Sequence, residues 1–206
     1  MPSTIGHALA GATIAWALPP SLGGSLGELR RDRLQRWLVP ACVVIAAAPD
    51  ADLAFGVHRT FTHSITATAV VALVATLVAM WRRAPIARIV IACTAAHASH
   101  LLLDWLAADN YPPYGMQLLW PFSDRWFISG LDLFLGTRRE QFFSAAAIQV
   151  NARAVAREIL ILGPIAYVAW LVARTRGSGH DGGGARARAR AATTERPAGN
   201  LDRSRR

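Results

Sequence analysis

Histidine and aspartate side chains lie in or beside the apolar segments of this chain, where charge is costly. Burying a titratable side chain at membrane depth costs free energy, and such residues usually have a function. Each is therefore a candidate site residue. Imidazole and carboxylate ligands together favour zinc, with iron or manganese as alternatives, over calcium. The candidates are His7, Asp50, Asp52, His58, His63, His97, His100 and Asp104.

Local spacing groups several of these candidates. His97, His100 and Asp104 stand at positions i, i+3 and i+7, which is the spacing of one helical face. Asp50 and Asp52 directly follow a proline that is expected to end a helix. The spacing therefore supports convergence of several of these side chains on one metal site.

Single members of the set have simpler interpretations. A lone histidine on an apolar helix is more often a packed core residue, and His97 fits that description. Asp50 alone could cap a helix or pair with Arg59. Thr62 is expected to cap the next helix, which would place His63 in its first turn. The set is thus a stronger signal than its members.

Five apolar stretches must position these residues. Spanning a bilayer takes roughly 20 apolar residues, with about 17 as the lower limit, so the third and fourth stretches qualify. The fifth gains length from an amphipathic run before it, Phe142–Glu158. No period-two alternation is present, so we predict an all-α, multi-pass helical membrane protein with about four to five apolar helices and a polar site at one end of the bundle. The stretches are Ile5–Leu18, Trp37–Ala48, Ile65–Trp81, Ile86–Leu106 and Ile159–Ala173.

Arginine placement predicts an orientation. If each stretch crosses once, the arginine-rich connections after the first and third stretches lie on the same side as the C-terminal tail. The positive-inside rule makes that side cytoplasmic. The candidate site residues then meet at the outer mouth of the bundle.

Composition excludes several classes of enzyme. The chain has 206 residues, 53% hydrophobic and 17% charged, against about 45–50% and about 25% in soluble domains. All 22 basic residues are arginine, so a lysine Schiff base, a pyridoxal phosphate enzyme and a Walker-type P-loop are excluded. Cys42 and Cys93 lie in apolar runs, without the spacing of a disulfide framework or a thiolate zinc site. Residues 177–206 form an Arg-rich segment that we expect to be a disordered tail in contact with anionic lipid, and no nucleic-acid pattern accompanies it.

The order of the motifs resembles one family. Gly-His-Ala-Leu-Ala-Gly at His7, Pro49-Asp50-Ala51-Asp52, His58-Arg59-Thr60-Phe61-Thr62-His63-Ser64, His100-Leu-Leu-Leu-Asp104 and Leu118-Leu119-Trp120-Pro121-Phe122-Ser123 are similar to the YdjM-like family of LexA-regulated bacterial inner-membrane, metal-dependent hydrolases. The resemblance covers about Met1 to Arg125. It implies a multi-pass helical protein of the inner membrane whose metal site contains His7, Asp50, Asp52, His58, His63, His100 and Asp104. More distantly, the ligand set is similar to that of zinc-dependent phospholipases C.

The sequence therefore predicts a membrane-bound hydrolase, residues 1–176, that uses metal-activated water on a phosphoester or lipid-like small molecule. Asp52 is expected to act as general base or to orient a ligand histidine, and Arg59 to stabilise an anionic substrate. The expected metal ligands are His7, Asp50, His58, His63, His100 and Asp104, with zinc preferred. An intramembrane ion or proton relay, or a non-catalytic protein with a structural metal site, are the alternatives.

Overall fold

A computed structural model describes residues 1–19, 22, 28–56 and 58–178. In these residues the chain has five α-helices, two 3-10 segments and no strand, which confirms the all-α prediction. Two isolated bridges, Ala107 with Phe134 and Met116 with Phe127, order the long connection before the last helix. The elements are α1 (Thr4–Ala17), α2 (Glu28–Ala47), η1 (Ala48–Phe55), η2 (Phe61–His63), α3 (Ile65–Trp81), α4 (Ile86–Trp105) and α5 (Ala145–Ser178).

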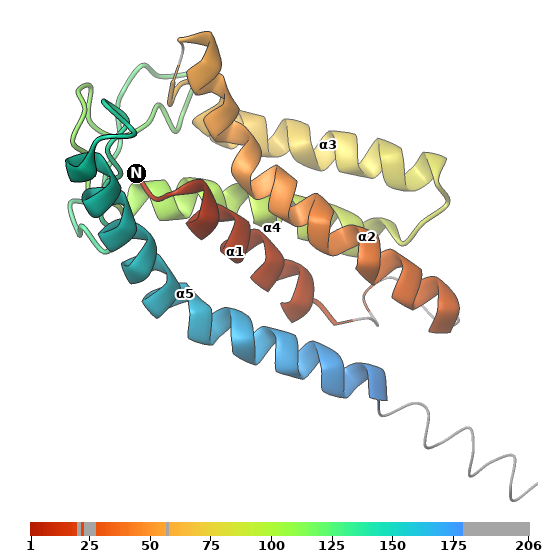
Figure 1. The fold of residues 1–206 in the computed structure, drawn as a ribbon. Coiled ribbons are helices and arrows are strands. Elements are labelled where there is room, and N and C mark those ends of the chain that lie inside the picture. Colours follow the sequence, from red (N-terminus) through yellow and green to blue (C-terminus); the bar gives the residue numbers. More distant parts are fainter. Residues whose placement is uncertain (20–21, 23–27, 57, 179–206) are drawn as a thin grey trace, which may run out of the picture.

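Successive helices run in alternating directions through the bundle (Figure 1). The first turns of α1, α3 and α5 and the last turns of α2 and α4 therefore lie at the same end. The connection between α4 and α5 also lies at this end, which we call the loop end. The opposite end holds the short α3–α4 turn and the C-terminal end of α5.

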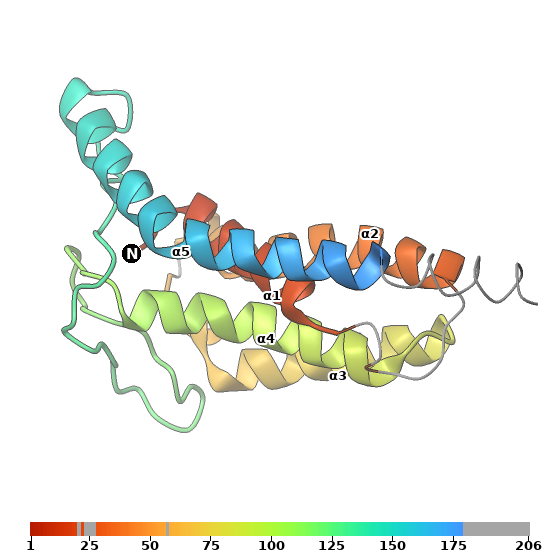
Figure 2. The ribbon, with the colours of Figure 1, turned by 90° about the horizontal axis from the view of Figure 1, so that it is seen from below.

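Small side chains let α1 approach its neighbours closely. Helix α1 packs against α2, α4 and α5, and Figure 2 shows α5 running along it. At Gly11 a Cβ atom would overlap the backbone carbonyl of Cys42 on α2, so only glycine fits there. Ala15 on α1 joins Ala46 on α2 and Ala96 on α4 in a fully buried core. Close backbone approach through glycine and alanine is the packing that membrane helices favour.

Three helical segments are long and apolar enough to cross a bilayer: Asp32–Phe55, Ile86–Trp105 and Ala145–Arg176. The α-helical part of the second stretch ends at Ala47, just before Pro49, as expected. The apolar segment is longer than expected because η1, with Pro49 in its first turn, follows directly. The fifth stretch merges with the amphipathic run before it, as predicted. The third stretch forms α3 with the expected bounds, and its 17 residues, at the lower limit for a span, make it shorter than all three.

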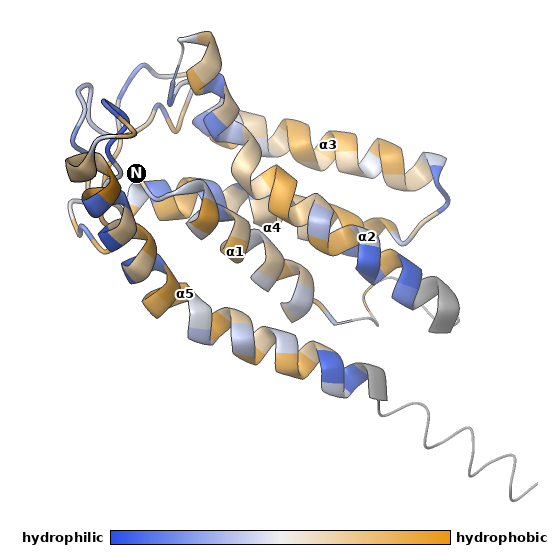
Figure 3. Cartoon of the chain, viewed as in Figure 1, coloured by the Kyte–Doolittle hydropathy of each residue, from blue (hydrophilic) through white to orange (hydrophobic). Residues whose placement is uncertain are grey.

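Apolar side chains on α3 and α5 point away from the protein. Leu73 and Leu77 of α3 and Leu160 of α5 are exposed, and Figure 3 shows apolar colour along both helices. A continuous exposed apolar surface of this kind is the contact that lipid provides. Residues 179–206, which contain most of the predicted tail, lie outside the described residues, so the tail and its boundary stay predictions.

Candidate metal centre

Four elements contribute side chains to one buried cluster at the loop end. The sequence explains this placement, because each residue lies in the first or last turns of its element: His7 near the start of α1, Asp50 in η1, His63 at the end of η2, and His100 with Asp104 in the last turns of α4. The three imidazoles are fully buried, Asp104 is nearly so, and Asp50 has a side chain that is 21% exposed. We call these five residues the centre.

The distances within the centre match those between the ligands of one metal ion. Nε2 of His7, His63 and His100 each lies 3.4 Å from a carboxylate oxygen of Asp104. The same three nitrogens lie 3.8–3.9 Å from the oxygens of Asp50, and Nε2 of His63 is 3.0 Å from Nε2 of His100. Ligand atoms bonded to one tetrahedral zinc at about 2.0–2.1 Å are roughly 3.3 Å apart. The residues present therefore fit a divalent ion.

Unsatisfied polar atoms support the same fit. Both ring nitrogens of His7 and both carboxylate oxygens of Asp104 are buried without a hydrogen-bond partner among the described residues. Leaving such atoms unpaired in a buried site is costly, and a cation between them would satisfy the imidazole lone pair and the carboxylate together.

The remaining ring nitrogens of two histidines fix their orientation. His100 Nδ1 lies 2.7 Å from the backbone oxygen of Ala46, and His63 Nδ1 lies 2.9 Å from Thr62 Oγ1 and 3.2 Å from Oδ2 of Asp52. With Nδ1–H held by these acceptors, Nε2 is the atom directed at the centre, and in a metal-bound form it would be the unprotonated ligand atom. This is the arrangement in which histidines that bind metal are commonly held.

Asp52 organises the residues behind His63. Besides His63, its carboxylate accepts hydrogen bonds from His58 Nδ1 at 2.6 Å, Thr62 Oγ1 at 2.5 Å and the backbone N–H of Arg59 at 3.2 Å. Its oxygens are thus occupied by orienting contacts, which is one of the two roles expected from the sequence. Thr62 does not cap α3 as expected; the cap is Ser64, whose hydroxyl accepts from the backbone N–H of Ala67.

The surrounding carboxylates make the centre attractive to positive charge. Burial by itself lowers the pKa of an imidazole, but the nearby carboxylates of Asp104, Asp50 and Asp52 outweigh it and raise the pKa of His63 to about 10. The same carboxylates would stabilise a metal cation. Because the metal would replace the proton on His63, its binding should release that proton.

Three other predicted residues lie beside the centre and not in it. His58 directs Nε2 at the Met1 sulfur and Arg139, so both of its nitrogens have partners, although it can form a second group with Asp50 and His63. Arg59 forms a buried ion pair with Asp109. His97 is hydrogen-bonded to Thr68 on α3 and is packed as a core residue.

Sequence reasoning missed three partners of this site. The side chain of Asp109 is buried against Arg59, and Asp109 follows α4 in a segment without periodicity. Arg139 belongs to the same irregular connection between α4 and α5. Glu158 is fully buried on α5 and accepts hydrogen bonds from the backbone N–H and the hydroxyl of Ser3, the N-cap of α1. Glu158 therefore fixes the start of α1, and with it His7.

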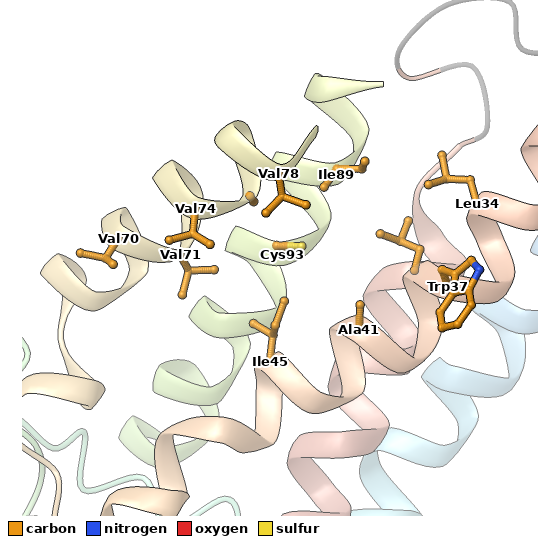
Figure 4. A pocket seen from close by; sticks show the side chains of 12 residues that line it. Leu34, Trp37, Ala41, Ile45, Val70, Val71, Val74, Val78, Ile89 and Cys93 are labelled. Atoms are coloured by element: carbon orange, nitrogen blue, oxygen red, sulfur yellow. The ribbon is translucent and has the colours of Figure 1, made fainter. Parts of the chain in front are cut away.

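Two cavities flank the core of the bundle. One, of about 590 Å³, is lined by Asp50 of the centre together with residues of the α4–α5 connection and the start of α1. The other, of about 450 Å³, lies between α2, α3 and α4 and is lined by side chains such as Val74, Ile45 and Cys93 (Figure 4). Of these two cavities, only the first is lined by a residue of the centre.

The fold and the centre define a helical membrane protein with residues that could hold a metal ion. The chain belongs to the YdjM inner membrane protein family, whose model matches residues 1–179. Comparison with curated proteins and with solved structures found no match. The expected similarity to zinc-dependent phospholipases C therefore stays a prediction.

Replacing Asp52 tests whether it orients the imidazole of His63. We expect Asp52→Asn to weaken zinc affinity about 10–100-fold, because an amide cannot hold both His58 and His63 as a carboxylate does. Zinc affinity of the detergent-purified protein is measured by competition with a chelating dye. Asp124→Asn, which removes the same charge from an exposed position, should leave it unchanged. Equal affinities of a folded Asp52→Asn variant and the unaltered protein would contradict this role.

Proposed function

We propose that this chain is a multi-pass, metal-dependent hydrolase of the inner membrane. The observation that carries the proposal is a buried His/Asp centre with one carboxylate, Asp50, lining a cavity of about 590 Å³. Structural zinc sites are closed by four protein ligands, whereas catalytic sites keep a position open to substrate. The grouping of the centre at the loop end also favours hydrolysis over an ion relay, which needs polar groups along the path across the bilayer.

The residues of the centre divide into ligands and positioning groups. His7, His63, His100 and Asp104 would hold the ion, with Asp50 on the open side. Zinc, or alternatively iron or manganese, would lower the pKa of a water molecule from about 15.7 toward about 7. Asp52 keeps the imidazole of His63 in place. Asp50, at the cavity, is placed to accept a proton from the attacking water.

Hydrolysis of chromogenic probes tests the proposal. We expect the purified protein to release nitrophenolate from at least one of three probes: a para-nitrophenyl phosphomonoester, its phosphodiester counterpart or a carboxylic ester. A chelator should abolish this activity and zinc or manganese should restore it. His63→Ala should lose the metal-dependent rate by a factor of about 100 or more, because removal of a ligand disrupts the metal site. His97→Ala, a buried histidine outside the centre, should keep the activity.

Equal rates with and without the chelator, or an unchanged rate in His63→Ala, would overturn the hydrolase proposal. Metal uptake with no turnover of any probe would favour the structural metal site.

The distribution of arginine supports an orientation with the centre on the outer side. At the end opposite the loop end, arginines lie on α2, on the short α3–α4 turn and at the end of α5, where Figure 3 shows hydrophilic colour. The arginines of the loop-end half lie mostly in or near the long α4–α5 connection, where acidic residues accompany them and where the positive-inside rule gives them less weight. The positive-inside rule then makes the end opposite the loop end cytoplasmic and the tail cytoplasmic with it, within reach of anionic lipid. The arginines at that end are Arg33, Arg36, Arg82, Arg83, Arg174 and Arg176.

Cysteine labelling tests this orientation. We expect Asp132→Cys, in the exposed α4–α5 connection, to react with a membrane-impermeant maleimide added to intact spheroplasts. Arg83→Cys, on the opposite turn, should react only after the membrane is opened. The native cysteines, Cys42 and Cys93, are buried and provide a low background. The reverse labelling pattern would contradict the orientation.

A further inference from the structure

Two adjacent arginines in the cavity beside Asp50 form no hydrogen bond or ion pair with a carboxylate among the described residues. Arg138 and Arg139 both line this cavity, together with Asp50 and Leu53. The Arg139 guanidinium contacts the Met1 sulfur at 2.7 Å and His58 Nε2 at 2.8 Å, and it stacks over the Tyr111 ring. All of these partners can be neutral. Within the described residues the Arg138 guanidinium has no hydrogen-bond partner at all, in contrast to Arg59, which is paired with Asp109.

The position of Arg138 is fixed by its backbone. Its N–H donates to Asn151 Oδ1 at 2.7 Å, and its carbonyl accepts from Asn151 Nδ2 at 3.0 Å. The neighbouring Thr137 N–H donates to the carbonyl of Met1. Asn151 lies on α5, so the arginine pair is attached to a rigid element and needs little ordering when an anion binds.

Apart from Ser3, Thr4, Thr137 and Asn151, the other lining residues of the cavity are apolar, and several of them are exposed. Ile5, Leu53 and Phe142 line it, and their side chains are 53%, 47% and 58% exposed. Exposed apolar side chains at the mouth of a cavity in a membrane protein are suited to a hydrocarbon chain. The cavity thus combines two cationic side chains, several apolar side chains and one residue of the candidate metal centre.

We propose that this cavity binds an amphiphile with a phosphate headgroup, with the phosphate against Arg138 and Arg139 and the hydrocarbon against Ile5, Leu53 and Phe142. Guanidinium groups bind phosphate through two parallel charge-assisted hydrogen bonds, and a pair without carboxylate partners can direct its donors at a ligand. The further step of taking this amphiphile as the substrate rests on the proposed hydrolase function, since its phosphate would lie beside Asp50. Binding itself requires no metal.

Binding of single-chain lipids tests the proposal apart from catalysis. The full-length protein in neutral detergent is titrated with a medium-chain lysophosphatidic acid by calorimetry, with and without a chelator. We expect affinity about tenfold or more above that for lysophosphatidylcholine of the same chain, whose choline offsets the phosphate charge. Glycerol phosphate, which lacks the hydrocarbon, should bind at least about tenfold more weakly than the lipid.

Matched variants locate the binding site. Arg138→Gln should weaken lysophosphatidic acid binding about tenfold, because one guanidinium is lost. Arg153→Gln, an exposed arginine of α5 that does not line the cavity, should have no effect. Leu53→Ser should weaken binding of the lipid but not of glycerol phosphate.

Equal affinity for the two lysolipids, or equal effects of Arg138→Gln and Arg153→Gln, would overturn the proposal. Equal affinity for the lipid and glycerol phosphate would show that the hydrocarbon chain contributes nothing to binding. The ligand would then be a soluble phosphate compound, which also overturns the proposal. Selective lipid binding without metal-dependent turnover would support this binding site and reject the hydrolase. Metal-dependent turnover of a probe without lipid binding would support the hydrolase and reject the lipid site.

Discussion

The cost of burying two carboxylates and three imidazoles at one end of an apolar bundle is the constraint on which the rest of this structure depends. Both oxygens of Asp104 and both ring nitrogens of His7 lack a hydrogen-bond partner among the described residues, so hydrogen bonds do not offset this cost. A cation at the point that their ligand atoms surround would offset it. The backbone contact of His100 and the carboxylate contact of His63 direct both Nε2 atoms to that same point.

The elements around the centre are arranged to keep it in place. Gly11 lets α1 lie against α2, and Glu158 holds the start of α1, so that His7 reaches Asp104. The Arg59–Asp109 ion pair joins the segment after η1 to the connection after α4. Contacts between distant parts of the chain therefore hold the residues of the centre in position. The apolar outer faces of α3 and α5 remain available for contact with lipid.

The sequence predicts the helices and the grouping of candidate residues better than it predicts their partners. Apolar periodicity is a local signal, so the all-α fold could be expected, and so could the shared face of His100 and Asp104. The 3-10 segment η1 that directly follows α2 could not, because a proline is compatible both with the end of one helix and with the first turn of the next. Asp109 and Arg139 come from an irregular connection whose path depends on tertiary contacts, and no local pattern reveals them. The ligand roles of His7, Asp50, His58, His63, His100 and Asp104 stay predictions.

The central claim is that the centre holds one divalent metal ion. Its most direct test is the metal content of the detergent-purified protein, by plasma mass spectrometry, beside a His63→Ala/His100→Ala variant and a His97→Ala control. The account predicts near-stoichiometric zinc, iron or manganese in the unaltered protein and in the control, and its loss in the double variant. A folded, metal-free protein that takes up no metal when it is supplied would contradict the account.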